Sequence, residues 1–135
     1  GPAIVQYVAD LVPEKKLAPA NGTMERYRMQ AMLNFIATEL HKSFGGLFSP
    51  AASDDWKKAA RAQIAARFDH VQTQLKGPHL FGEQFTVADA YLFTVLNWGQ
   101  FCDIDISAWP RLAEFAARVA QRPAVQAALK AEGLV

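Results

Sequence analysis

The sequence contains little that would support a disulfide scaffold or a nucleic-acid-binding protein. Its 135 residues include one cysteine, Cys102, so no internal disulfide bond can form. The 14 Lys and Arg residues and 13 Asp and Glu residues leave a net charge of +1. Nucleic-acid binding needs a concentrated basic face, and the segment Lys57–Arg61 is too small a cluster to provide one. We therefore expect no nucleic-acid partner.

Several other signals are missing as well. The apolar segment 87–101 is too short and carries too many polar groups to cross a bilayer, and residues 1–7 lack the charged start of a secretory signal. A single cysteine suits a reducing compartment, so we expect a cytoplasmic protein, with the periplasm as the alternative. The histidine spacing fits no metal site, and GxSxG, P-loop and dinucleotide motifs are absent. We expect neither a membrane nor a metal partner.

What the sequence does have is helical periodicity from end to end. The pattern predicts an all-α fold, an irregular bundle of about five to six helices around a buried central helix. Segment 11–22 carries two prolines and ends in Asn-Gly, which indicates a linker, and Gly45-Gly46 is expected to end the second helix. Trp56 is expected to begin the buried stripe of the third helix. The expected helices cover residues 2–10, 23–44, 53–76, 87–101, 110–122 and 124–132.

The central helix begins with a capping motif. Thr86 and Asp89 have the spacing of a capping box, in which each side chain pairs with the other residue's backbone N–H. The helix that follows is apolar at nearly every position from Val87 to Phe101, which predicts burial on almost all faces. Because water cannot complete a buried helix end, the cap must come from the sequence, and we interpret Thr86 and Asp89 as structural.

A row of polar residues lies beside the core stripe of the second helix. Asn34, Thr38 and His41 are spaced i, i+4 and i+7, so they are expected to share one helical face. Such a row is usually solvated, but at the edge of a packed interface it can also meet a cleft or a partner. Composition alone favours the solvated face.

A resemblance to a known family changes that weighting. The motif ELHKSF at residues 39–44, with the segment 45–50 after it, resembles the beta class (the bacterial class) of glutathione transferases. Further segments resemble the same family. Residues 3–10 resemble the last helix of its thioredoxin-like domain, and residues 80–89 resemble the loop and cap of its core helix. Residues 109–112 and 118–125 resemble its closing helices. The resemblance therefore implies three parts: residues 1–10 as the last helix of a missing thioredoxin-like domain, 11–22 as a linker, and 23–135 as the C-terminal helical domain.

The resemblance also implies roles for individual residues. His41 matches a histidine that points into the active-site cleft, toward the glutathione sulfur and the catalytic cysteine, and Lys42 would add a cation beside it. A histidine suits this place because it can donate a hydrogen bond to a thiolate. Asn34 matches an asparagine that reaches glutathione bound to the neighbouring subunit, which implies a homodimer. An apolar pocket for the acceptor would be lined by Phe44, Leu47, Phe48 and Trp98.

These matches imply conjugation of glutathione, as co-substrate, to a small hydrophobic electrophile. The catalytic cysteine of the family belongs to the missing domain, so this chain is expected to hold about half of a composite site. The alternative is a non-catalytic module of the same fold that mediates protein–protein contact. A dyad of Cys102 with His41 has no support, because Asp103 and Asp105 next to the thiol disfavour a thiolate.

Overall fold

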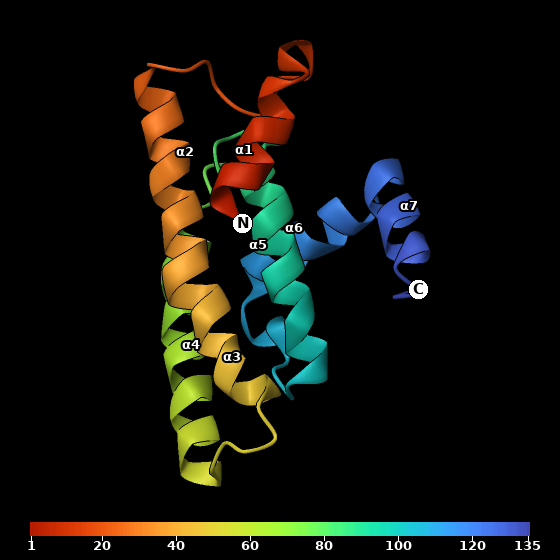
Figure 1. The fold of residues 1–135 in the computed structure, drawn as a ribbon. Coiled ribbons are helices and arrows are strands. Elements are labelled where there is room, and N and C mark those ends of the chain that lie inside the picture. The colour runs from red at the N-terminus through yellow and green to blue at the C-terminus, as the bar shows by residue number, and fades with distance from the viewer.

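The computed structural model describes residues 1–135 and is helical throughout, without strands (Figure 1). Six helical rods make up the fold, which confirms the predicted all-α bundle. The second rod consists of three consecutive segments, α2, the π-helix η2 and α3. The elements are α1 Pro2–Asp10, η1 Pro13–Lys15, α2 Met24–Phe35, η2 Ile36–His41, α3 Lys42–Phe48, α4 Asp54–Gln74, α5 Val87–Asn97, η3 Trp98–Phe101, η4 Ile106–Ala108, α6 Pro110–Ala120 and α7 Pro123–Ala131.

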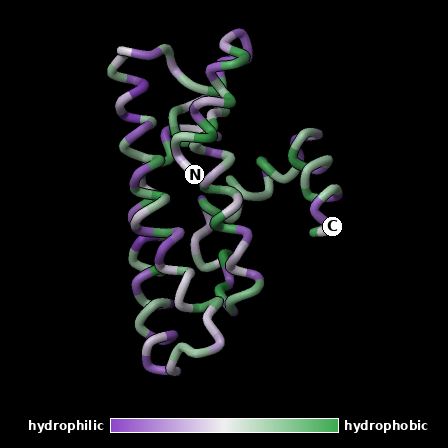
Figure 2. Tube along the Cα trace, in the orientation of Figure 1, coloured by the Kyte–Doolittle hydropathy of each residue, from purple (hydrophilic) through white to green (hydrophobic).

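One apolar core joins these helices. Figure 2 shows hydrophilic residues along α2 and α4, whereas α5 is mostly hydrophobic. This difference matches their places, because α2 and α4 each bury one stripe while α5 lies among its neighbours. The buried side chains of the shared core include Leu33, Leu40, Phe68, Leu92 and Phe115, each at most 1% exposed.

The second rod differs from its sequence-based prediction in two ways. It does not end at Gly45-Gly46 but continues to Phe48, and residues 36–41 form a π-helix within it. A Cβ atom at Gly46 would lie 2.7 Å from the ring of Trp56, so this glycine makes room for an aromatic ring and does not stop the helix. Trp56 itself is 54% exposed, which corrects the expectation that it is buried; its ring lies across the end of α3.

The central helix is also less enclosed than its composition predicts. α5 ends at Asn97 and continues as the 3₁₀ turn η3, and Phe101 at its end is 60% exposed. Tyr91 and Trp98 are only half-buried and Thr94 is exposed. These residues recur at i, i+3 and i+7, so they form one open face of a helix that is otherwise packed. The exception to the predicted burial on almost all faces is this face.

The start of α5 is fixed by a buried carboxylate. The capping box of Thr86 and Asp89 is present. Asp89 accepts from the backbone N–H of Thr86 at 2.8 Å and from its hydroxyl at 3.0 Å. It also accepts from the N–H of Leu80 at 2.8 Å, so a single side chain joins the preceding loop to the helix. Burial raises the pKa of Asp89, and these hydrogen bonds oppose the rise.

A buried histidine beside this cap gives stability a pH dependence. Burial lowers the pKa of His79 below its ordinary 6.5; the charges of Asp89 and Glu83 oppose this shift, and those of Arg118 and Arg122 add to it. The folded state therefore favours neutral His79. The contribution of neutral His79 to stability is complete above about pH 6.5. It is lost as the pH falls through the lowered pKa that His79 has in the folded state.

Substituting His79→Leu is therefore expected to weaken the loss of stability between about pH 7 and pH 5. Nδ1 of His79 has no hydrogen-bond partner, so the substitution breaks no bond at that atom. Urea unfolding at several pH values measures the difference. Asp89, whose raised pKa favours folding at lower pH, is present in both proteins, so the comparison isolates the contribution of His79 and its attraction to Asp89. Equal slopes in both proteins would contradict the prediction.

Helix α1 is tied to α2 by one arginine. Arg26 is 3% exposed and holds Asp10 through two bonds of 2.9 and 2.8 Å. It also donates to the side chain of Gln6 at 3.1 Å and to the carbonyl of Pro19 at 2.9 Å. This pairing raises the pKa of Arg26, because the hydrogen bond to Asp10 stabilises the charged form. The contacts fix α1 on the bundle; the division of the chain at residues 10 and 22 stays a prediction.

Candidate functional site

His41 lies at the end of the π-helix, facing the open side of α5. Its Nδ1 is 2.9 Å from the hydroxyl oxygen of Tyr91. Its ring meets that of Trp98 edge-on, with centroids 4.7 Å apart and planes at 87°. The imidazole is nevertheless exposed. Tyr91 of α5 and Trp98 at the start of η3 thus hold the ring in place while leaving part of it accessible.

Tyr91 connects this histidine to the start of the chain. A Cβ atom placed on Gly1 would lie 3.2 Å from the Tyr91 hydroxyl oxygen. Gly1, the residue before α1, and the ring of His41 therefore both lie beside the Tyr91 hydroxyl, although they are far apart in sequence. Burial raises the pKa of Tyr91, so the hydroxyl keeps its proton at neutral pH. Sequence reasoning gave Tyr91 no role, and the only signal for it was its spacing of seven residues from Trp98 on one helical face.

The other polar residues of the predicted row do not join this contact. Asn34 and Thr38 are exposed, and the Thr38 hydroxyl donates to the backbone carbonyl of Asn34 at 2.9 Å. Lys42 is exposed and has no ion pair within the chain. The π-helix Ile36–His41 lies between Asn34 and the end of this row, and its i→i+5 turns are wider than α-helical ones. The roles expected of Asn34 and Lys42 stay predictions.

The predicted apolar pocket residues form one aromatic cluster. The ring of Trp98 lies 5.7 Å from that of Phe44 and 5.8 Å from that of Phe48, both edge-on. Phe44 is fully buried and packs on Phe68, so it supports this cluster from the core side. Phe48 is 50% exposed, and Leu47 is half-buried. Of the four predicted residues, Phe48, Trp98 and Leu47 therefore reach the surface.

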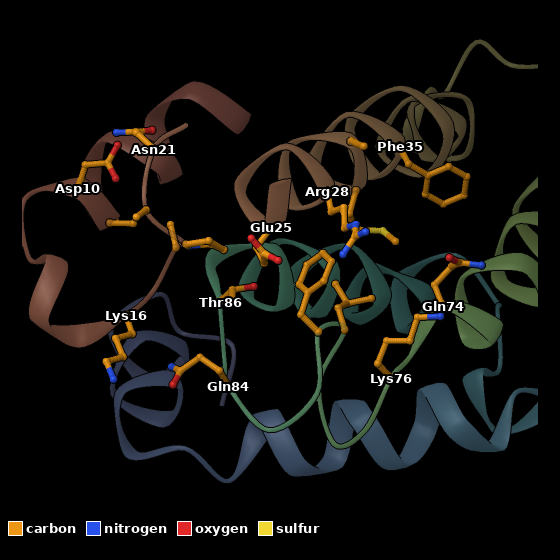
Figure 3. A pocket seen from close by; sticks show the side chains of 18 of the residues that line it. Asp10, Lys16, Asn21, Glu25, Arg28, Phe35, Gln74, Lys76, Gln84 and Thr86 are labelled. Carbon is orange, nitrogen blue, oxygen red and sulfur yellow. The ribbon is translucent and has the colours of Figure 1, made fainter. Parts of the chain in front are cut away.

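Two of the cavities on the bundle bear on the site. One, of about 710 Å³, lies between α5 and α7 and is mostly apolar, with Trp98, Phe93, Val125 and Leu129 among its lining residues. The other, of about 1290 Å³, lies among the 9–21 segment, α2 and the loop before α5 (Figure 3). The larger cavity is lined by charged groups such as Glu25, Arg28 and Lys76 and by Thr86 of the cap, and it contains none of the residues predicted to bind glutathione or the acceptor. Trp98 thus joins the contact with His41 to the apolar cavity.

Cys102 does not take part in this site. It is 4% exposed, and burial raises the pKa of its thiol, which Arg61 opposes and Asp103 increases. A thiol held protonated in this way is a poor nucleophile. No group of three or more His, Cys, Asp or Glu residues is arranged to hold a metal ion. No helix combines the length and hydrophobicity needed to span a bilayer.

Comparisons with known proteins agree with the helical fold. The family model "Glutathione S-transferase, C-terminal domain" matches residues 35–123. Glutathione S-transferase GstA of Escherichia coli O157:H7 is 44% identical over 135 residues, which cover 99% of this chain and 67% of that protein. A solved bacterial beta-class glutathione S-transferase from Sphingomonas chungbukensis is 47% identical, with a TM-score of 0.94 over 99% of this chain and 67% of that one.

A sphingomonad glutathione S-transferase solved in complex with glutathione is similar to the same degree. It is 46% identical, with a TM-score of 0.93 over 99% of this chain and 67% of that chain. This chain thus spans about two thirds of the length of each of these relatives. Both the helical architecture and the sequence agree along nearly the whole chain.

Proposed function

This chain belongs to the beta (bacterial) class of the glutathione transferase family, and we propose that it supplies the helical half of a site that conjugates glutathione to hydrophobic electrophiles. The observation that carries the proposal is the placement of His41. Its Nδ1 contacts Tyr91, its ring is held by Trp98, and the imidazole is still exposed beside the start of α1. A solvated polar residue would have no need of such fixed surroundings.

On the thiol side, His41 has one ring nitrogen left for a ligand. Because Nδ1 is taken by Tyr91, Nε2 is the atom available to the glutathione sulfur. A hydrogen bond from Nε2 would stabilise the thiolate, which is the nucleophile, and Lys42 would add positive charge nearby. A lower thiol pKa and a fixed position relative to the electrophile are the two contributions expected of such a site.

On the acceptor side, Phe48, Leu47 and Trp98 would form an apolar wall, with Phe44 supporting it from the core. Small hydrophobic electrophiles fit because the wall offers aromatic faces and few charges. The hydrogen bonds around Asn34 leave its side-chain amide free, and this amide would reach glutathione held by a second copy of the protein in a homodimer. We place the protein in the cytoplasm, where glutathione is abundant and thiols stay reduced.

The alternative of a non-catalytic module is the weaker reading. Protein–protein contact requires a complementary surface, but it does not require a histidine whose ring is held on two sides and left exposed. Both readings predict the same fold, so only chemistry separates them.

The composite nature of the site is tested by comparing two proteins. The full-length protein is expected to conjugate glutathione to 1-chloro-2,4-dinitrobenzene, and residues 1–135 alone are expected to give no rate above the uncatalysed reaction. The reason is that a thioredoxin-like domain, which would bind most of the glutathione, would precede α1 in the full-length protein. Rapid turnover by residues 1–135 alone would contradict the composite site. A full-length protein inactive toward several electrophiles would favour the module.

A further inference from the structure

We propose that Tyr91 is a positioning residue that holds His41 in the tautomer with its proton on Nε2. The proposal rests on the function proposed above, since it explains how the exposed nitrogen becomes a hydrogen-bond donor. It starts from one contact, the 2.9 Å separation between the Tyr91 hydroxyl oxygen and Nδ1 of His41. Heavy-atom positions alone leave open which of the two atoms carries the proton.

The chemistry of the two groups decides the direction. A phenol oxygen is a poor acceptor because its lone pair is delocalised into the ring, whereas an unprotonated imidazole nitrogen is a good one. Tyr91 therefore donates its O–H to Nδ1, and the single proton of neutral His41 is left on Nε2. The partial burial that raises the pKa of Tyr91 acts in the same direction, because it keeps the donor protonated.

The surroundings of the His41 ring also oppose a ring flip that would break this contact. Trp98 meets it edge-on at 4.7 Å, and Trp98 is itself packed against Phe44 and Phe48. Tyr91 of α5 and Trp98 of η3, the turn that continues this helix, are seven residues apart and project from the same face of it. A ring flip would place a carbon opposite the Tyr91 hydroxyl and lose the hydrogen bond. Position and tautomer are thus set by the same helix.

The consequence for the site is specific. An imidazole with its proton on Nε2 offers a donor to the glutathione thiolate, whereas the other tautomer would offer a lone pair and repel it. Tyr91 would contribute without touching either substrate. In many proteins a neighbouring residue orients a functional histidine by a hydrogen bond to its other ring nitrogen, and this bond sets the tautomer of the histidine.

Nitrogen NMR of the full-length protein labelled with ¹⁵N-histidine tests the proposal directly. In the wild-type protein, Nδ1 of His41 is expected to resonate as an unprotonated ring nitrogen and Nε2 as a protonated one at neutral pH. In Tyr91→Phe, the two signals are expected to move toward the averaged positions of a mixture of tautomers. Tyr27→Phe, at a site that is 57% exposed, is the matched control and is expected to leave His41 unchanged. Assignment comes from the signal lost in His41→Gln.

Activity provides the second measurement. Tyr91→Phe is expected to lower kcat/KM about five- to tenfold, the loss that one hydrogen bond allows. A wild-type His41 protonated on Nδ1, or identical His41 signals in wild-type and Tyr91→Phe, would overturn the proposal. These signals are read without substrate, so they stand apart from the proposed function, which fails instead if the full-length protein has no transferase activity.

Discussion

Substituting Asp89→Ala is expected to lower the free energy of unfolding by about 2–6 kcal/mol, because it leaves two buried backbone donors unpaired at about 1–3 kcal/mol each. These donors are the N–H groups of Leu80 and Thr86, both 2.8 Å from the carboxylate. Asp89 is fully buried, so water cannot replace it. Denaturant unfolding followed by circular dichroism measures the change.

Two further substitutions sharpen this prediction. Asp89→Asn keeps one carbonyl oxygen and can satisfy one of the two backbone donors, so about 1–3 kcal/mol of the loss is expected. Glu114→Ala removes an exposed carboxylate from the middle of α6 and should change stability by less than about 0.5 kcal/mol. If Asp89→Ala were no more destabilising than Glu114→Ala, the cap would not be what fixes the start of α5.

The cap also shows how far the sequence alone determines the fold. Helix starts with side-chain caps were predictable because the signal is local: Thr23, Ser53 and Thr86 all precede observed helices. The helical end at Gly45-Gly46 was mispredicted for a tertiary reason, since only the position of Trp56 reveals why a small residue is needed there.

The site was less predictable than the fold. His41 was found through its motif, but its partner Tyr91 lies 50 residues away, and nothing in the sequence pairs the two. The π-helix at residues 36–41 was also beyond reach, because a sequence pattern read at 100° per residue assumes α-helical turns throughout. The open face of α5 was read as buried for a related reason: apolar residues look the same whether a helix or another domain covers them.

Substituting His41→Ala in the full-length protein is expected to lower kcat/KM for conjugation about 10- to 100-fold. The expectation follows from the loss of a hydrogen bond to a charged thiolate, worth about 1.5–3 kcal/mol. Without that donor the thiol of bound glutathione should titrate at higher pH, which the ultraviolet absorbance of the thiolate reports. The acidic limb of the pH–rate profile should move in the same direction.

A second histidine in the chain provides the control. His70 is exposed on α4, its ring tilted against that of Phe35 with ring centroids 5.1 Å apart, and it does not contact Tyr91 or Trp98. His70→Ala is therefore expected to keep kcat/KM within about twofold of the wild type. A rate loss shared equally by both variants would indicate a general effect on the bundle. An unchanged thiol titration in His41→Ala would show that the imidazole does not reach the sulfur, because the hydrogen bond to a thiolate cannot be removed without raising the thiol pKa.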